Sequence, residues 1–178
     1  GSGDEYQRMD EIQNTLARFI IPLNFPAAYD VEDPYDASLI AYEDLKHWEM
    51  APGNPAFLEQ SNITFALTTS DLKDRNKFMK NLRKAIQYGL SEKQALKALT
   101  AIPADLLGIQ NKTGALKPGM LANFVITSGN IFDEKNIIYQ NWVNGNRYVM
   151  NDISIVDIRG HYELKIGMDR MYLLKISG

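Results

Sequence analysis

Two short apolar runs, each followed by a helical stretch, most constrain how this chain can fold. Arg18–Phe25 is compact and apolar, and Asn62–Thr69 is apolar and rich in β-branched residues. Both patterns predict buried strands. The first run leads into a helical pattern over Ser38–Trp48, and the second leads into one over Asp74–Tyr88. Because parallel strands need an intervening helix, two such units in succession predict parallel β/α architecture.

The number of these units falls short of a complete barrel. A closed barrel of alternating strands and helices takes eight units and about 250 residues. This chain has 178 residues and shows two units. Ahead of the first unit, Asp4–Ala17 carries apolar residues at helical spacing and predicts a short amphipathic helix. We therefore expect the trailing β/α units of an incomplete barrel.

Capping residues mark the start of the next helix. Gly89 is placed to end the preceding helix, and Ser91 with Gln94 three residues later predicts a capping box. The helix itself is expected over Glu92–Thr100, with Pro103 marking its end.

After Gly108 the pattern changes to short strands and turns. Asn144-Gly145, between two apolar runs, indicates a type I′ hairpin. Near the C-terminus, two alternating runs joined by Met168–Met171 predict an antiparallel hairpin with Tyr, Leu and Ile on one face. The expected strands are Ala122–Thr127, Ile137–Val143, Arg147–Met150, Tyr162–Gly167 and Tyr172–Ser177.

Composition narrows the class of protein. The chain is 45% hydrophobic and 23% charged, the balance of a globular protein. A net charge of -3 gives no electrostatic basis for nucleic-acid binding. The basic residues from Lys73 to Lys84 share a predicted helix with an apolar stripe, so we interpret them as a solvated helix face. The absence of cysteine excludes disulfides and thiolate chemistry, and no apolar window reaches the length of a membrane helix.

The stretch from Ser91 to Gly145 contains an ordered set of small, apolar and turn-forming residues. They are Ser91, Ala95-Leu96, Ala98, Thr100, Pro103-Ala104, Leu107-Gly108-Ile109, Gly114, Leu116, Pro118-Gly119, Ala122, Val125 and Trp142-Val143-Asn144-Gly145. In order and spacing this set resembles the closing segment of the amidohydrolase superfamily, where the last barrel helix runs into a small β-sandwich. Asn123 departs from the aspartate usual in that family, which suggests a divergent branch. Asn62–Tyr88 is similar to the last β/α unit of the barrel.

The resemblance implies a hydrolase of carbon–nitrogen bonds with imidazolonepropionase-like leanings. Members of the family hold one or two divalent metals with a His-x-His pair, a carboxylated lysine or glutamate, further histidines, and an aspartate after the eighth strand. The metal lowers the pKa of a bound water and polarises the scissile carbonyl, and the aspartate relays the proton. A divalent metal, expected to be zinc, is thus implied for the full-length parent and none for this chain alone, which has two histidines and no His-x-His.

Asp71 is the position to which the resemblance carries the family's catalytic and metal-binding aspartate. The family more often shows Gly-Ser-Asp or Gly-Thr-Asp directly after the apolar run, whereas this chain has Thr68-Thr69-Ser70-Asp71. From the residues alone, Asp71 is more simply a loop aspartate or the N-cap of the following helix, a role equally open to Asp74.

Other residues that could bind a metal are better explained without one. His47 lies in a predicted helix and His161 precedes a predicted strand, and a zinc site needs at least three converging protein ligands. The acidic loop Asp30–Asp36 lacks the glycine and terminal glutamate of an EF-hand loop. We interpret the histidines as packing or surface residues and the loop carboxylates as solvated.

These observations divide the chain and define an expected function. The expectation is an α+β fold, with residues 1–3 as a tag remnant, 4–110 as C-terminal barrel units, 111–151 as part of a small β-sandwich, and 152–178 as a hairpin extension. The parent is expected to hydrolyse a small-molecule amide or cyclic amide with metal-activated water, and the fragment to be inactive. The alternative is a noncatalytic structural or interaction module. Expected partners are the remainder of the barrel and, for the fragment, further copies of itself, with neither nucleic acid nor membrane. The compartment stays open.

Overall fold

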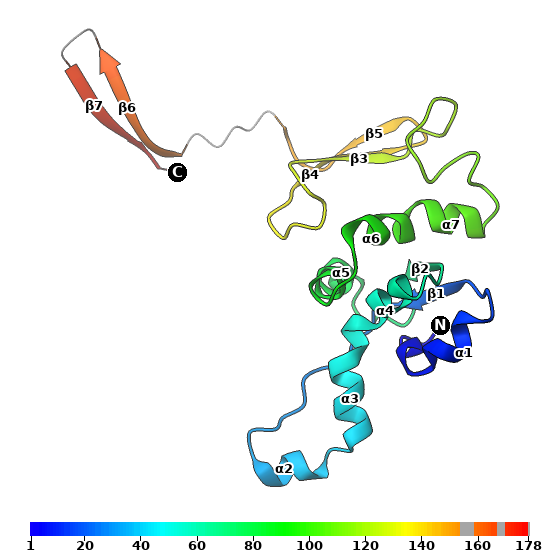
Figure 1. Ribbon diagram of the computed structural model, residues 1–178. Helices are drawn as coiled ribbons and strands as arrows, with labels where there is room; N and C mark the ends of the chain where they lie inside the picture. Colours follow the sequence, from blue (N-terminus) through cyan, green and yellow to red (C-terminus); the bar gives the residue numbers. More distant parts are fainter. Residues whose placement is uncertain (154–158, 167–169, 178) are drawn as a thin grey trace.

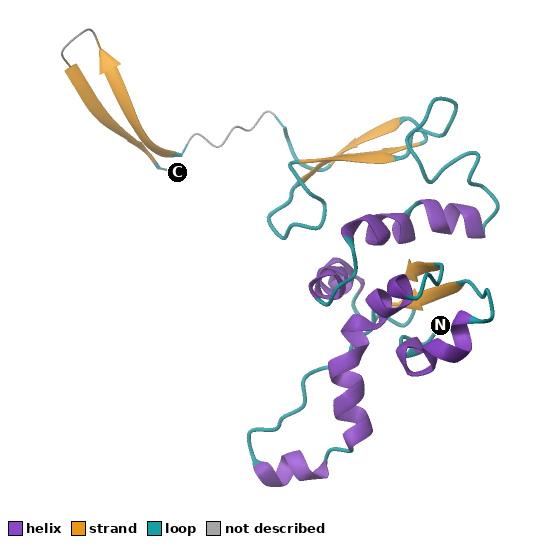
Figure 2. Ribbon diagram, in the orientation of Figure 1, coloured by secondary structure: helices purple, strands orange, loops and turns teal. Residues whose placement is uncertain are grey.

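The computed structural model describes residues 1–153, 159–166 and 170–177 (Figure 1). Its strands are β1 (Phe19–Pro22), β2 (Phe65–Thr68), β3 (Phe124–Thr127), β4 (Ile138–Val143), β5 (Asn146–Val149), β6 (Gly160–Ile166) and β7 (Arg170–Ile176). Its α-helices are α1 (Met9–Gln13), α2 (Pro34–Leu39), α3 (Tyr42–Met50), α4 (Asn54–Gln60), α5 (Phe78–Gln87), α6 (Glu92–Leu99) and α7 (Ala101–Leu106). Short 3₁₀ turns cover Glu5–Arg8, Ala51–Gly53 and Arg75–Lys77. The result is a mixed α/β fold with small, separate sheets (Figure 2).

A parallel pair of strands, β1 and β2, lies at the centre of the hydrophobic core. Phe19 pairs with Phe65 and Pro22 with Thr68, so both strands end at the same edge. Ile21 and Phe65 are fully buried, in one cluster with side chains from α4, α5 and α6. The two predicted apolar runs therefore do form parallel strands, with helices between them.

The N-terminal residues are held against this core by a buried carboxylate. Glu5 accepts hydrogen bonds from the backbone N–H of Ser2 and from Nδ2 of Asn54, both at 2.7 Å. Asn54 Oδ1 in turn accepts from the backbone N–H of Tyr6 at 2.8 Å. Because Glu5 and Asn54 are both buried, these bonds satisfy groups that water does not reach.

The predicted helix boundaries around Gly89 and Ser91 are confirmed. The N–H of Gly89 donates to Ile86 at 3.0 Å and that of Leu90 to Ala85 at 3.1 Å, the paired bonds of a Schellman C-terminus. Ser91 Oγ accepts from the N–H of Gln94 at 3.1 Å. Ser91 is thus the N-cap of α6 as predicted, whereas the other half of the capping box is absent, because the N–H of Ser91 donates to Glu59 and not to the side chain of Gln94.

The helix expected over Glu92–Thr100 is confirmed, because α6 ends at Leu99 with Thr100 as its C-cap. Pro103 does not mark that end, however, since it lies in the first turn of a further helix, α7, which was not predicted. A proline in the first turn of a helix costs no hydrogen bond, since the N–H there has no partner within the helix. The stretch expected from Ser38 is also two helices: α2 starts at Pro34 with Asp33 as its N-cap, and the chain is extended at Ile40 before α3 begins.

The segment between β1 and α4 projects away from the core (Figure 1). We call residues 29–49, which include α2 and most of α3, the arm. Neither of its helices buries a residue. The base of the arm is held by His47, whose Nδ1 lies 3.0 Å from the hydroxyl of Tyr6.

The C-terminal half forms antiparallel sheets. In the order β3-β4-β5, Asn144 (φ 51°) and Gly145 (φ 79°) form the two-residue turn between β4 and β5, which confirms the predicted type I′ hairpin. β6 and β7 form a separate hairpin in which Tyr162 pairs with Leu174. Met168, in the turn predicted between them, lies outside the described residues. No helix in the described ranges has the length and apolar character to cross a membrane.

Candidate functional site

The carboxyl ends of β1 and β2 lie side by side and carry polar residues. β1 is followed by Asn24, and β2 by Thr69, Ser70 and Asp71, all of them exposed or half-buried. In parallel β/α folds, ligands bind beyond this edge of the sheet because the loops there bring side chains from several strands together. The sequence-predicted Asp71 is therefore placed where catalytic side chains of such folds lie.

The loop that carries Asp71 is held by local hydrogen bonds. The N–H of Ser70 donates to Thr68 Oγ1 at 3.1 Å, and the N–H of Leu72 donates to the carbonyl of Thr69 at 3.3 Å. Asp71 has φ 61°, a left-handed conformation that aspartate adopts more readily than most residues. Ser70 Oγ lies 3.5 Å from Asp71 Oδ2, so the carboxylate has one weak donor in its own loop.

The cap of the following helical turn is Asp74, not Asp71. Asp74 is the residue before the 3₁₀ turn Arg75–Lys77, and its Oδ1 accepts from the N–H of Asn76 at 3.0 Å. One of the two structural roles considered for Asp71 is therefore filled by another residue. Its side chain remains available at the strand edge.

The end of β1 contributes a residue that sequence reasoning missed. Asn24 Nδ2 donates to the carbonyl of Asp71 at 3.4 Å and so connects the ends of the two strands. The strand end is itself fixed from α5, because Asn81 Nδ2 donates to the carbonyl of Leu23 at 2.7 Å. In the sequence, what could have indicated a role for Asn24 is its position directly after an apolar run.

Both histidines lie apart from Asp71 in the sequence and on other elements. His47 is on α3, where its ring stacks on Tyr6 with centroids 6.1 Å apart. Burial raises the pKa of the Tyr6 hydroxyl, an effect that its hydrogen bond with Gln7 partly offsets and that nearby Asp4 reinforces. His161 is exposed on β6. The interpretation of His47 as a packing residue fits these contacts.

Within the part of the chain that the structure describes, no three His, Asp or Glu side chains come together as a metal site. Zinc in a catalytic site takes three protein ligands. Asp71 alone does not meet this requirement, so the described residues do not by themselves fit the metal that the resemblance implies.

The carboxylates of the acidic loop have local structural partners. Asp33 Oδ1 accepts from the N–H of Tyr35 at 2.7 Å as the N-cap of α2, and Asp30 Oδ1 accepts from the N–H of Glu32 at 3.3 Å. These bonds account for two of the residues that had suggested a calcium site.

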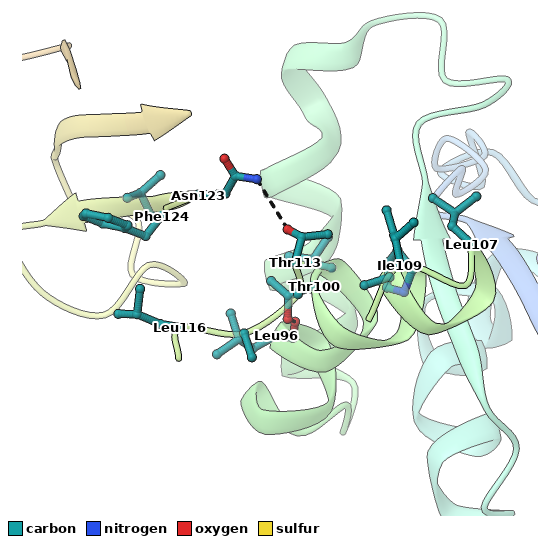
Figure 3. A pocket seen from close by; sticks show the side chains of 14 residues that line it. Leu96, Thr100, Leu107, Ile109, Thr113, Leu116, Asn123 and Phe124 are labelled. Carbon is teal, nitrogen blue, oxygen red and sulfur yellow. Dashed lines mark hydrogen bonds between the residues drawn. The ribbon is translucent and has the colours of Figure 1, made fainter. Parts of the chain in front are cut away.

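An apolar groove of about 630 Å³ lies between the helices α6 and α7 and the strand β3 (Figure 3). Leu96, Leu107 and Leu116 line it, and all three are exposed to a large degree. None of its lining residues is acidic, basic or histidine. The groove is therefore an apolar surface, without a carboxylate or imidazole of the kind that binds a metal or relays a proton.

The motif residues from Ser91 to Gly145 act through backbone geometry. Gly108 (φ 70°) ends α7 with the same paired bonds as Gly89 ends α5. A Cβ on Gly114 would lie 2.7 Å from Cβ of Ala104, so only glycine fits there. Asn123 Oδ1 accepts from the N–H of Asn144 at 2.7 Å, and its Nδ2 donates to Thr113 Oγ1 at 3.4 Å (Figure 3). The motif therefore fixes the joint between α7 and the sheet.

Solved structures of other proteins share the fold of this chain. An amidohydrolase from Thermotoga maritima MSB8 aligns with a TM-score of 0.61 and 20% identity, covering 82% of this chain and 34% of that one. A prolidase complexed with N-methylphosphonate-L-proline gives 0.57 and 14%, covering 79% and 37%. A Xaa-Pro dipeptidase with bound methionine in the active site gives 0.52 and 16%, covering 83% and 32%. The chain thus spans about a third of the length of these proteins.

The sequence itself matches the family model of the amidohydrolases over residues 54–151, more than half of the chain. No curated protein matches it. This chain belongs to the amidohydrolase family, and the resemblance found in its motifs is confirmed. The matched residues include Asp71, both helices of the groove and the three-stranded sheet.

Proposed function

We propose that this chain is the C-terminal part of a metal-dependent amidohydrolase that hydrolyses the carbon–nitrogen bond of a small amide or cyclic amide. Residues 4–110 are then the trailing β/α units of its barrel, 111–151 a portion of its β-sandwich, and 152–178 a hairpin extension. The observation that carries the proposal is the position of Asp71, at the carboxyl end of β2 and inside the region that matches the family.

Asp71 is proposed as the metal-binding and proton-relaying carboxylate of the full-length site. A carboxylate at the end of a barrel strand can take a proton from an attacking water and deliver it to the leaving nitrogen. Asn24 supports this role by holding the carbonyl of Asp71, and with it the left-handed backbone from which the carboxylate projects. The remaining ligands, for zinc as the expected ion, have to come from other residues of the full-length protein.

The remainder of the barrel is the proposed partner of the exposed surfaces. β1 and β2 form a sheet of two strands, and strand edges without neighbours favour pairing with further strands. The apolar groove beside α6 and α7 is a second surface of this kind. We expect the fragment alone to be inactive and to self-associate through these surfaces.

The test uses the full-length protein and two variants. Asp71→Asn is expected to lower bound metal and to reduce hydrolysis at least a hundredfold, measured by elemental analysis and by a panel of cyclic amides, linear amides and Xaa-Pro dipeptides. Asp74→Asn is the matched control, because asparagine caps a helix as well as aspartate does. Unchanged metal content and turnover in Asp71→Asn would remove this residue from the site.

A noncatalytic module derived from an amidohydrolase is the second candidate. It is favoured by Thr68-Thr69-Ser70-Asp71, which lacks the family's glycine, and by the absence of a three-ligand group among the residues described. Full-length protein without a His-x-His pair, without bound metal and without hydrolytic activity would establish this candidate instead.

A further inference from the structure

Apart from the contact of His47 with Tyr6 at its base, the arm, residues 29–49, has little packing that explains its ordered helices. α2 has 6 residues and α3 has 9, and neither buries a side chain. Isolated helices shorter than about 12–15 residues are marginal in water. Its large side chains are also uncovered: Tyr35 is 72% exposed, Leu39 68% and Tyr42 76%. A surface of this kind is typical of a helical pair that packs against another molecule.

The arm is also strongly acidic. It contains seven acidic residues and one lysine, a net charge of -6, whereas the whole chain has a net charge of -3. Among the described residues the ion pair is that of Arg18 with Asp105, so no carboxylate of the arm forms an ion pair with another described residue. The rest of the molecule is correspondingly positive.

One segment of the chain carries a concentrated positive charge. Residues 73–84, at the start of and along α5, contain six basic residues and one acidic residue, a net charge of +5. Arg83 donates to the backbone carbonyls of Phe132 and Asp133, and the ammonium group of Lys84 lies over the rings of Phe25 and Tyr88. Lys73, Lys77 and Lys80 are exposed and form no ion pair with any residue in the described ranges.

We propose that the arm of one copy of this chain docks against the basic segment, residues 73–84, of a second copy. The two surfaces are complementary in sign and nearly equal in charge, so their approach is electrostatically favoured at low salt. The exposed rings of Tyr35 and Tyr42 offer contact area to the aliphatic stems and ammonium groups of the lysines. This interface is separate from the proposed active site and does not depend on it.

Charge reversal on each surface tests the proposal. One variant carries Glu32→Lys, Glu43→Lys and Glu49→Lys in the arm, and another carries Lys73→Glu, Lys77→Glu and Lys80→Glu in the basic segment. None of these six side chains makes a hydrogen bond or ion pair with another residue that the structure describes, so both variants should fold. Circular dichroism and urea denaturation verify that they do.

Light scattering at low salt is the measurement. The unmodified chain is expected to associate. Its dissociation constant should rise at least tenfold between about 50 and about 300 mM salt, because salt in this range increasingly screens the attraction between exposed charges. Each variant alone should bind its own copies at least tenfold more weakly, because the changes reduce the net charge of the arm from -6 to 0 and that of the basic segment from +5 to -1, which removes the attraction between the two surfaces. An equimolar mixture of the two variants should regain association, because the unaltered arm of one variant (net charge -6) then meets the unaltered basic segment of the other (net charge +5).

A matched control and the contrary results complete the design. Lys93→Glu with Lys97→Glu reverses exposed charges on α6, outside both surfaces, and should leave association unchanged. A monomer at low salt, association of the variants equal to that of the unmodified chain, or a mixture that stays monomeric would each overturn the proposal. Association that is insensitive to salt in all variants would instead assign it to the apolar groove and strand edges.

Discussion

The carboxylate of Glu59 accepts hydrogen bonds from both the backbone N–H and the hydroxyl of Ser91, at 2.8 and 2.5 Å. Ser91 is the N-cap of α6, and Glu59 is near the end of α4. In a capping box the side chain of Gln94 would take the N–H of Ser91. Here a residue 32 positions away takes it, so the start of α6 is tied to α4 and to the core beneath.

Removing either partner of this contact should destabilise the chain. We expect Glu59→Ala and Ser91→Ala each to lower the free energy of unfolding by about 1–2 kcal/mol, since each removes a charge-assisted bond or a helix cap. The double variant should lose about 0.5–1 kcal/mol less than the sum, because the two changes remove the same interaction. Urea denaturation measures all three. Strict additivity would show that the contact contributes nothing.

Alanine substitutions at glycines should show whether close packing or backbone conformation requires a glycine. Gly114→Ala should cost about 3–4 kcal/mol, because its Cβ would meet Ala104 and its φ is 92°. Gly108 also has a positive φ, 70°, but a Cβ there would meet no atom within 4 Å. Gly108→Ala should therefore lower the free energy of unfolding by about 1 kcal/mol. Gly129→Ala has neither constraint and should be nearly neutral. Thermal or urea unfolding of the three variants gives the order, and equal losses for Gly114→Ala and Gly108→Ala would exclude the packing explanation.

The buried pair of Glu5 and Asn54 should be sensitive to loss of the amide. Asn54→Ala leaves the Glu5 carboxylate buried without one of its donors and the N–H of Tyr6 without its acceptor. We expect a loss of about 2–4 kcal/mol in the free energy of unfolding. Asn76→Ala, at an exposed position, is the control and should change stability by less than about 0.5 kcal/mol. Similar losses in both variants would contradict the role given to the buried pair.

Tyr6 should make stability depend on alkaline pH. Because burial raises the pKa of its hydroxyl above the usual value near 10, the folded chain retains the proton at a pH where the unfolded chain releases it. The contribution of the protonated Tyr6 hydroxyl to the free energy of unfolding is therefore fully present below about pH 10. It is lost as the pH rises through the pKa of the folded state. Melting temperatures from pH 8 to 11 should fall less steeply for Tyr6→Phe than for the unmodified chain. If the melting temperatures of the two proteins fell equally steeply with pH, Tyr6 would not be the source of this pH dependence.

Local patterns in the sequence predicted much of the fold. The glycine after α5, the serine before α6 and Asn144-Gly145 specify conformations through their own backbones, and all three predictions were confirmed. The two apolar runs also predicted the parallel strands correctly. These features depend on residues within a few positions of each other, which is the range over which spacing is informative.

The features that were missed depend on longer distances or on competing signals. Asp33 followed by Pro34 is a helix start that the sequence displays, but the acidic composition of the loop suggested a turn instead. The contacts of Glu59 with Ser91 and of Asn24 with Asp71 join residues 32 and 47 positions apart. For the candidate site, Asp71 was located from the family resemblance, whereas its neighbour Asn24 became visible only once the two strands were paired.

The absence of buried residues in α2 and α3 has a consequence for local unfolding of the molecule. The free energy that holds β1, β2 and α5 together comes from their shared buried side chains, and the arm adds none to it. The helices of the arm can therefore unfold and refold while the core stays intact, as a separate cooperative unit of low stability. Their amide protons should exchange with solvent orders of magnitude faster than those of the central strands.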